Sequence, residues 1–530
     1  MSGRVKVPAK ESAKNQIYNN ALMRSVDEKV FFLEAGQGRN VNGNVFALLR
    51  YIRSQKRFDD WSIKLALVPD KFNEAGSKFD KYSINGVKIV EFGNSEYREG
   101  LATAKYLITD NSFPAYFYKR PEQVYLNTWH GTPLKALGRT DIDNAISIAN
   151  VQANMVKADY LLYPNRFTKD IMMKDFMMEG VFGNSTVVCD YPRNDTLHRE
   201  EFRDEISEKY GLKGKKVIAY MPTWRGTGRD ADADEQLAKT EEIIAGLDER
   251  LNDDEVLFVN LHFLIGSRIN FAKYDKVFGF PVEYETYDFL ACCDVLITDY
   301  SSVAIDFAGT GKDIILFIYD YEQYKKDKGF YLDVKELPFR KVYSLDELAG
   351  SVHEKGPKYK LNKLLQSCNE GRACEKMIRL MIDGDEEGLE VCDCSTRRAA
   401  PLIAYFENIN RDDSREMIRK LEEEYPEAES RPVIMFPNNM TPETIETLKS
   451  LDKGTDFVRV SGRFYCSNEE FNSLWMHKKT GLFRTKAEDI YRREAMRNIG
   501  QFRSCGVEVM QCRNADRLSE LSILNKDRKR

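Results

Sequence analysis

The sequence contains no apolar run of the roughly 20 residues that a membrane-spanning helix needs. Its basic first residues, MSGRVKVPAKESAKNQIYNN, are not followed by the apolar core of a signal peptide. The ten cysteines are scattered, include no CxxC pair and are too few for a disulfide scaffold. These absences predict a cytoplasmic protein with reduced thiols and without a zinc site.

An excess of charge of one sign is also missing, because 79 Lys and Arg stand against 84 Asp and Glu. We therefore expect no nucleic acid partner. Hydrophobic residues make up 42% and aromatic residues 12% of the sequence, which excludes disorder over most of its length. A chain of 530 residues is too long for one hydrophobic core and predicts three or four domains.

Short apolar runs alternate with amphipathic stretches along most of the chain, for example the strand-like run at 29–35 and the helix-like stretch at 43–55. This alternation predicts two tandem units, each with a parallel sheet covered by helices on both faces, that meet around 190–215. The charged stretch 229–255 is predicted to be a solvated loop followed by a surface helix. Further strands are expected at 62–70, 105–110, 123–129, 158–165, 185–195, 215–226, 255–263, 294–311 and 312–320.

The composition changes near residue 388. The stretch EVCDCSTRRAA at 390–400 is predicted to be a linker, and strand-like and helix-like stretches alternate again after it. This third unit contains no motif that indicates a role. We therefore expect it to be separable, so that a chain ending near residue 390 still folds and keeps its activity.

Polar side chains follow several of the predicted strands. Ligands of such sheets bind beyond the carboxyl ends of the strands, so side chains placed there favour an enzyme with a cleft between its units. These side chains belong to His130, Arg193, Thr223, Arg225, His262, Ser301 and Ser302.

His130 has the strongest claim to a catalytic role. It lies in YLNTWHGTPLKALG, where Gly131 and Pro133 predict an exposed loop. An exposed histidine can act as a general acid or base near neutral pH. His262 follows the strand-like run VLFVNL, and a hydrogen-bonded histidine in the core is the alternative there.

The stretch LITDYSSVAIDF places Ser301 and Ser302 where a buried strand becomes a helix, with Asp306 one turn later. Two interpretations stay open, a plain helix N-cap and a phosphate and ribose site at the exposed N–H groups. Arg193 and Arg225 each follow a strand and a proline. Arginine suits bidentate contact with phosphate, and a surface salt bridge is equally open for either residue.

Two features bear on metals. The stretch DADADEQLAKTE has a glutamate where a calcium loop needs glycine. No DxD motif stands at the end of a predicted strand. We therefore expect a site that works without a metal ion or another cofactor.

Six motifs occur in one order: TWHGTPLKALG, DYPRND, MPTWRG, LH after a strand, LITDYSSVAIDF and KGFYLDVKELP. This series, over roughly residues 30–350, resembles the CDP-glycerol glycerophosphotransferases, which include teichoic acid primases and polymerases and their ribitol-phosphate and capsule relatives. The resemblance implies a GT-B fold, with two Rossmann-like domains facing a cleft. It makes residues 29–190 the acceptor-side domain and residues 191–388 the CDP-donor domain. The polar basic arm at 1–28 and the additional α/β unit at 389–530, which is unfamiliar in the family, are expected from the sequence pattern alone.

The resemblance also implies roles for single residues. His130 would deprotonate the acceptor hydroxyl, and His262 would stabilise charge on the pyrophosphate. Phe263 stands where the family usually has proline, which departs from the pattern beside His262. Together with Arg225, the substrate-binding residues are expected to be Gly131, Thr132, Pro133, Leu134, Arg193, Pro222, Thr223, Asn260, Leu261, Ser301, Ser302 and Asp306.

The implied reaction moves glycerol phosphate, or a related polyol phosphate, from a CDP donor to a hydroxyl of a lipid-linked or glycan acceptor and releases CMP. Lipid-linked acceptors and the basic stretches at both ends of the chain predict peripheral attachment to an anionic membrane surface on its cytoplasmic side, and homo-oligomerisation stays open. Two alternatives are a GT-B glycosyltransferase that uses a nucleotide sugar and a non-catalytic scaffold of a surface-polymer assembly.

Overall fold

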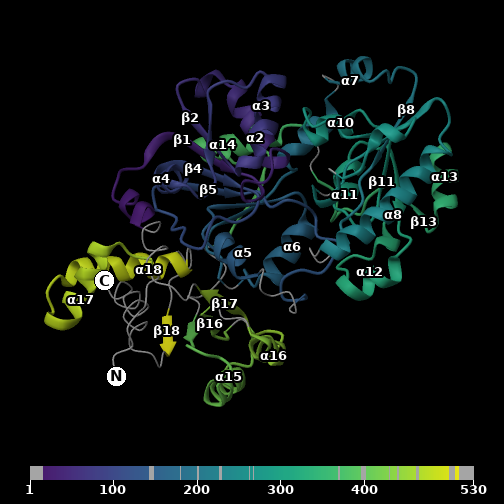
Figure 1. Ribbon diagram of the computed structural model, residues 1–530. Helices are drawn as coiled ribbons and strands as arrows, with labels where there is room; N and C mark the ends of the chain where they lie inside the picture. The colour runs from purple at the N-terminus through teal and green to yellow at the C-terminus, as the bar shows by residue number, and fades with distance from the viewer. Residues whose placement is uncertain are drawn as a thin grey trace.

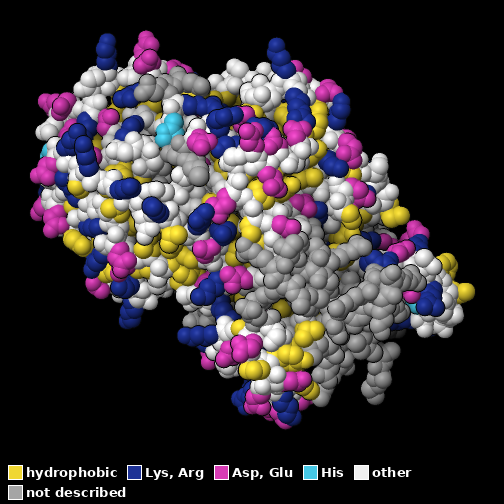
Figure 2. Space-filling view, turned by 180° about the vertical axis from the view of Figure 1, so that it is seen from behind, with side chains coloured by type: hydrophobic (Ala, Val, Ile, Leu, Met, Phe, Trp, Pro, Cys, Tyr) yellow, Lys and Arg dark blue, Asp and Glu magenta, His cyan; other side chains and the backbone are white. Residues whose placement is uncertain are grey.

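The computed structural model describes residues 16–141, 148–179, 181–199, 202–225, 230–261, 263–266, 268–367, 370–394, 402–428, 430–437, 441–460, 465–499 and 508–511. These residues form a mixed α/β protein with three sheets, of eight, six and four strands (Figure 1). Basic and acidic side chains are interspersed over the face that Figure 2 shows, in keeping with the small net charge. Among the helices described, none combines the length and the apolar character that crossing a bilayer requires.

The first sheet has the strand order β14-β7-β6-β5-β4-β1-β2-β3 and is parallel except for β14. The order reverses between β1 and β4, so the carboxyl ends of these two strands form the topological switch point, where sheets of this kind bind ligands. Its strands are β1 (Asp27–Glu34), β2 (Ser62–Leu67), β3 (Val87–Glu91), β4 (Ala104–Thr109), β5 (Val124–Asn127), β6 (Tyr160–Tyr163), β7 (Ser185–Val188) and β14 (Glu390–Asp393). The helices in this part of the chain are α2 (Gly43–Ser54), α3 (Phe72–Lys81), α4 (Ser95–Thr103), α5 (Ile148–Met155) and α6 (Arg166–Asp175).

The second sheet is parallel throughout, with the order β10-β9-β8-β11-β12-β13 and its reversal between β8 and β11. Its strands are β8 (Lys216–Tyr220), β9 (Glu255–Val259), β10 (Val277–Gly279), β11 (Val295–Thr298), β12 (Asp313–Phe317) and β13 (Arg340–Val342). Its helices are α7 (Arg203–Lys209), α8 (Asp230–Asp248), α9 (Phe263–Gly266), α10 (Thr286–Ala291), α11 (Val303–Ala308), α12 (Tyr321–Lys328) and α13 (Leu345–His353). Helix α8 begins at Asp230, so the DADAD stretch is helical where we expected a loop.

Buried polar contacts join α2 and α3 of the first unit to α10 of the second. Arg50 pairs with Asp288 at 2.7 Å, and the Tyr82 hydroxyl donates to the same carboxylate at 2.6 Å. The Gly43 N–H donates to Glu285 at 3.0 Å. Because Asp288 and Glu285 are buried, these contacts hold the two units in one relative position on this side of the molecule.

The chain returns to the first sheet after the second. Helix α14 (Ala373–Asp383) packs its apolar face into the core beside α2 and β1, and the Asp195 carboxylate accepts hydrogen bonds from its first two N–H groups at 2.8 and 2.9 Å. Strand β14 then pairs antiparallel with β7. The prediction of a linker from 390 was therefore wrong for residues 390–393. The boundary expected at residue 388 falls between α14, which packs on the first sheet, and β14, which is part of it.

The third sheet has the order β17-β16-β15-β18 and is parallel. It consists of β15 (Leu402–Tyr405), β16 (Val433–Pro437), β17 (Phe457–Val460) and β18 (Glu508–Gln511). The helices of this unit are α15 (Asp412–Glu424), α16 (Pro442–Ser450), α17 (Asn468–Thr480) and α18 (Arg484–Ile499). The alternation of strand and helix expected here is confirmed.

The third unit shares a hydrophobic core with the first, which joins Phe457 of β17 to Met155 and Phe176. Buried Gln152 donates hydrogen bonds to the carbonyls of Phe176 and Phe457 at 2.8 and 3.0 Å. Arg139 donates to carbonyls of the third unit at Asp452 and Thr455. The two units therefore bury apolar and polar groups against each other.

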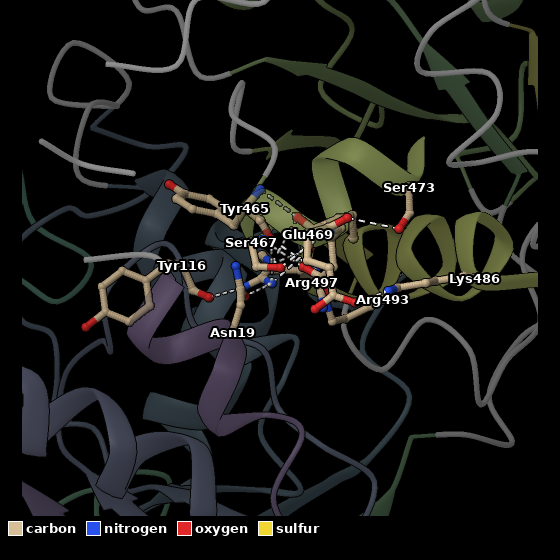
Figure 3. A network of polar contacts seen from close by, with 11 residues as sticks. Asn19, Tyr116, Tyr465, Ser467, Glu469, Ser473, Lys486, Arg493 and Arg497 are labelled. Carbon is tan, nitrogen blue, oxygen red and sulfur yellow. Dashed lines mark hydrogen bonds and ion pairs between the residues drawn. The ribbon is translucent and has the colours of Figure 1, made fainter. Parts of the chain in front are cut away.

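A second contact runs through Arg497 of α18 (Figure 3). Its side chain is 1% exposed and pairs with Glu494 at 2.7 Å. Its guanidinium also donates to the Tyr116 carbonyl and, at 3.4 Å, to Asn19, both in the first unit. The third unit is therefore bound to the first by a buried charged side chain as well as by a shared core, which argues against the expected separability.

A chain that ends after Cys394 is therefore expected to aggregate, because it exposes the apolar surface that Phe457 and its neighbours cover. A chain that ends after Gln511 keeps every contact named above and serves as the control. Soluble yield and gel filtration of the two proteins compare them directly. A monodisperse shorter chain that unfolds cooperatively would show that the first two units do not need the third.

Candidate active site

The loop after β5 presents His130 to solvent and buries its neighbour Trp129. The two rings stack, with centroids 4.0 Å apart. Trp129 has a φ of +50°, which is rare for a bulky residue. Two hydrogen bonds hold the backbone of Trp129 in this conformation. Its N–H donates to the Asn127 side chain at 3.0 Å, and its carbonyl accepts from the Asn44 side chain at 3.2 Å. His130 is exposed as expected, but Trp129 and residues 131–134 around it are buried, so the expectation of an exposed loop was right for His130 alone.

The protonation state of His130 follows from its partner. Its Nδ1 lies 2.9 Å from the backbone carbonyl oxygen of Asp110. A carbonyl oxygen only accepts hydrogen bonds, so Nδ1 carries the hydrogen and Nε2 has a free lone pair. Although the His130 side chain reaches solvent, the protein packed around its ring desolvates it and lowers its pKa, and the nearby Asp110 carboxylate opposes this shift only in part. The ring is therefore neutral and oriented as a proton acceptor.

Two buried carboxyl groups lie at the reversal point between β1 and β4. Asp110 accepts a hydrogen bond from the Gly36 N–H at 2.8 Å, and Glu34 accepts one from the Tyr97 hydroxyl. Burial raises the pKa of Asp110 and raises that of Glu34 to about 8, with the Asp110 charge adding to the shift of Glu34. Glu34 therefore keeps its proton at neutral pH.

Glu34→Gln is expected to stabilise the protein increasingly as pH rises from 4.5 to about 8. The folded state holds a proton on Glu34 in this window and the unfolded state does not, so the wild type loses stability with rising pH. The amide keeps the shape and carries no ionisable proton. Urea unfolding of both proteins across the window measures the difference, and parallel stability curves would contradict the raised pKa.

The loop after His130 touches the second unit closely. A Cβ atom on Gly131 would collide with Oγ of Ser302, so a larger residue fits here only if the Ser302 side chain moves. Ser302 occupies the N-cap position of α11, yet its side chain makes no capping hydrogen bond, and Oγ of Ser301 accepts from the Val303 N–H at a long 3.4 Å. Plain capping therefore does not account for Ser302.

Arg193, in η5 (Pro192–His198), ties the His130 loop to α11. Its guanidinium donates to the His130 carbonyl at 2.9 Å and pairs with Asp306 at 2.6 Å. The Tyr287 hydroxyl donates to the same Asp306 oxygen at 2.6 Å. Burial disfavours the charge of Arg193, but Asp306 outweighs it and the pKa of Arg193 is raised. The pair is an internal one, with side chains 9% and 2% exposed, and not a surface salt bridge.

Thr223 and Arg225 lie at the reversal point between β8 and β11. The Thr223 N–H donates to both carboxylate oxygens of Asp299 at 3.0 Å. Arg225 pairs with Asp299 and, at 2.9 Å, with Asp320. Two carboxylates therefore occupy the Arg225 guanidinium in largely buried ion pairs, and not in the surface salt bridge that the sequence left open.

The remaining predicted residues fall into three groups. Thr132, Pro133 and Leu134 are buried, and Leu134 belongs to the core of the second unit. Half-buried side chains at the ends of β8 and β9 belong to Pro222, Asn260 and Leu261. His262 lies outside the described residues.

Two residues of this site are not among the catalytic and substrate-binding residues expected from the sequence. Asn44 of α2 donates to the Trp129 carbonyl and accepts from the Arg193 N–H at 3.3 Å, so it connects two of the expected motifs. Asp110 supplies the carbonyl that orients His130. Asp110 ends a predicted strand and could have been found by the rule that identified His130. Asn44 lies in a helix and gave no such signal.

Comparison with known proteins identifies the family. The profile described as CDP-Glycerol:Poly(glycerophosphate) glycerophosphotransferase matches residues 16–381. A teichoic acid poly(glycerol phosphate) polymerase of Bacillus spizizenii is 30% identical over 343 residues, which are 62% of this chain and 84% of that protein. The polymerase of Bacillus subtilis is 28% identical over 376 residues, 65% of this chain and 46% of that protein, so the chain spans less than half of its length.

A solved structure agrees with these matches. A variant of the wall teichoic acid polymerase TagF that was soaked with CDPG has a TM-score of 0.55 and 25% identity, over 70% of this chain and 93% of that one. The family resemblance of the six motifs is thus confirmed, and the matched region ends before the third sheet. This chain therefore belongs to the CDP-glycerol:poly(glycerophosphate) glycerophosphotransferase family of enzymes.

Proposed function

We propose that the protein transfers glycerol phosphate from CDP-glycerol to a hydroxyl of a lipid-linked or glycan acceptor in teichoic acid synthesis. The family and its teichoic acid polymerases support this reaction. The observation that carries the mechanism is the free Nε2 lone pair of His130, fixed by the Asp110 carbonyl.

In the proposed step, Nε2 of His130 takes the proton of the acceptor hydroxyl. The hydroxyl oxygen bonds to the phosphorus that carries glycerol, the pyrophosphate P–O bond breaks, and CMP leaves. Phosphoryl transfer depends mainly on positioning and on stabilisation of charge, and a general base adds to both. The lowered pKa of His130 keeps the base form available at neutral pH.

We place this step in a GT-B-like cleft between the first two units, with the acceptor on the side of the first sheet and the donor on the side of the second. The close approach of Gly131 to Ser302 brings the base to the second unit. Ser301, Ser302 and His262 are proposed to bind the pyrophosphate. Arg193 is already paired with Asp306, so we assign it to positioning His130 and α11.

Three further features belong to this proposal. The donor polyol is glycerol, with ribitol as the nearest alternative. The enzyme acts on the cytoplasmic face of the membrane as a peripheral protein. It needs no metal ion, in line with the absence of a DxD motif at a strand end. Among the residues described, no group of three or more His, Cys, Asp or Glu side chains is arranged to hold one.

A donor panel tests the proposal. We expect CMP release with CDP-glycerol, less with CDP-ribitol and no nucleotide release from UDP-sugars, at equal rates with and without a chelator. Turnover of a UDP-sugar instead would identify a glycosyltransferase. Donor binding without any turnover, in the presence of acceptors, would identify a scaffold.

A further inference from the structure

Helices α17 and α18 form a hairpin in the part of the chain beyond the family match. The hairpin projects at one edge of the molecule (Figure 1). Nine large hydrophobic side chains are exposed among the described residues, and four of them lie here. They are Phe471, Trp475, Leu482 and Phe483, exposed by 42%, 48%, 56% and 54%. A cluster of this kind marks an interaction surface.

These four side chains are not part of the small core of the hairpin. Leu474 of α17 packs against Ala487 and Tyr491 of α18 and thus forms the contact between the helices. Phe471 and Trp475 are one helical turn apart on the exposed side of α17. Leu482 and Phe483 lie in the turn itself. The apolar groups of the tip are therefore available to a partner.

The charge of the tip indicates the chemistry of that partner. Residues 471–487 include four basic side chains, Lys478, Lys479, Arg484 and Lys486, and the acids that pair with Arg484 and Lys486 are the flanking Glu488 and Glu469. These pairs lie at the surface, so they neutralise the basic tip only weakly. The Lys479 ammonium lies 4.2 Å from the centre of the Trp475 ring. In Figure 2, hydrophobic side chains lie beside dark blue ones at the projecting edge that carries this hairpin. Aromatic side chains mixed with lysine are typical of the boundary between lipid headgroups and acyl chains.

The tip is held rigidly. Phe483 has a φ of +58°, which is unusual for an aromatic residue, so the backbone presents its ring outward at a conformational cost. At the base of the hairpin, Arg493 pairs with Glu470, and Arg497 anchors α18 to the first unit (Figure 3). A strained, exposed aromatic residue on a fixed support is consistent with a binding role.

We propose that this tip binds an anionic phospholipid surface. Trp475, Leu482 and Phe483 enter the headgroup boundary, and the basic side chains contact lipid phosphates. Exposed aromatic rings beside lysine favour a lipid surface, and a second copy docked tip to tip would bring the basic side chains of both copies together. The inference gives a location to the membrane attachment proposed above. Vesicle binding is measured without donor or acceptor. The proposed lipid contact can therefore be refuted while the proposed transfer reaction is unaffected.

The test is co-sedimentation of the full chain with vesicles of phosphatidylcholine, alone or mixed with phosphatidylglycerol. We expect binding only to the mixed vesicles, and a blue shift of fluorescence that Trp475→Phe abolishes. Lys478→Gln and Lys479→Gln should each lower the partition constant about fivefold. Phe483→Gly should lower it about tenfold and keep the fold, because glycine suits its positive φ. Val282→Ser and Leu364→Ser, at exposed apolar positions elsewhere, are the controls and should bind as the wild type does.

Two results would overturn the proposal. The first is unchanged vesicle binding in a combined Trp475→Ser, Phe483→Gly variant with wild-type thermal stability. The second is concentration-dependent self-association that the same variant abolishes, with no vesicle binding by the wild type, which would assign the tip to a second copy of the chain.

Discussion

His130→Ala is expected to reduce turnover about a hundred- to ten-thousandfold while CDP-glycerol still binds. The substitution removes the only group that we assign as proton acceptor, and it leaves Arg193 and α11 in place because Arg193 contacts the backbone carbonyl of residue 130. The turnover of His130→Asn should fall by the same factor, because the asparagine amide cannot accept the proton. Single-turnover rates and donor affinity by calorimetry separate chemistry from binding.

His198→Ala is the matched control, since His198 is an exposed histidine on η5 to which we assign no role. Near-normal turnover in His130→Ala would refute the assignment of the base. Loss of donor affinity in proportion to the loss of rate would make His130 a donor ligand instead.

The pH dependence of kcat/KM tests the role of His130 independently. Because burial lowers the pKa of His130, its neutral form persists to lower pH than that of an ordinary histidine at 6.5. The acid limb of kcat/KM should therefore lie below pH 6.5 and disappear in His130→Ala.

Asp306→Ala is expected to destabilise the protein by about 3–5 kcal/mol, because it leaves the buried Arg193 guanidinium without its counter-charge. The Tyr287 hydroxyl loses its acceptor in the same variant. Glu99→Ala, which breaks the exposed pair with Arg24, is the control and should cost less than about 1 kcal/mol. Midpoints of urea unfolding measure both.

A double variant distinguishes stability from function. Arg193→Met with Asp306→Leu removes both charges and should recover much of the lost stability, because buried ion pairs are often replaceable by apolar residues. Transfer should stay low, since no guanidinium then holds the His130 carbonyl. Recovery of full activity would show that the pair has no positioning role.

The sequence predicts those parts of the fold that depend on local pattern. Buried parallel strands such as β1 and β11 are continuous apolar runs, which makes them recognisable. Strand β3, VKIVE, lies at the edge of its sheet and contains charged residues, so it was missed. Strand β14 was read as a linker because its partner β7 is far away in the sequence.

Local pattern likewise predicts only some of the residues of the candidate site. His130, Arg193 and Ser302 each follow a strand, and the structure brings them together. Asn44 and Tyr287 come from helices of different units, and their contacts depend on how those units pack. The contact of Arg497 with the first unit could not be predicted from the sequence either. A basic residue in a polar helix is normally exposed, and the sequence does not indicate that Arg497 is buried.

The most direct test of the account is the mass of a lipid-linked acceptor that ends in glycerol phosphate, after incubation with CDP-glycerol. We predict that the acceptor gains one or more glycerol phosphate units, that one CMP is released for each unit, and that His130→Asn abolishes both. An acceptor that gains a sugar from a nucleotide sugar, or one that gains no mass while no CMP is released, would contradict the account.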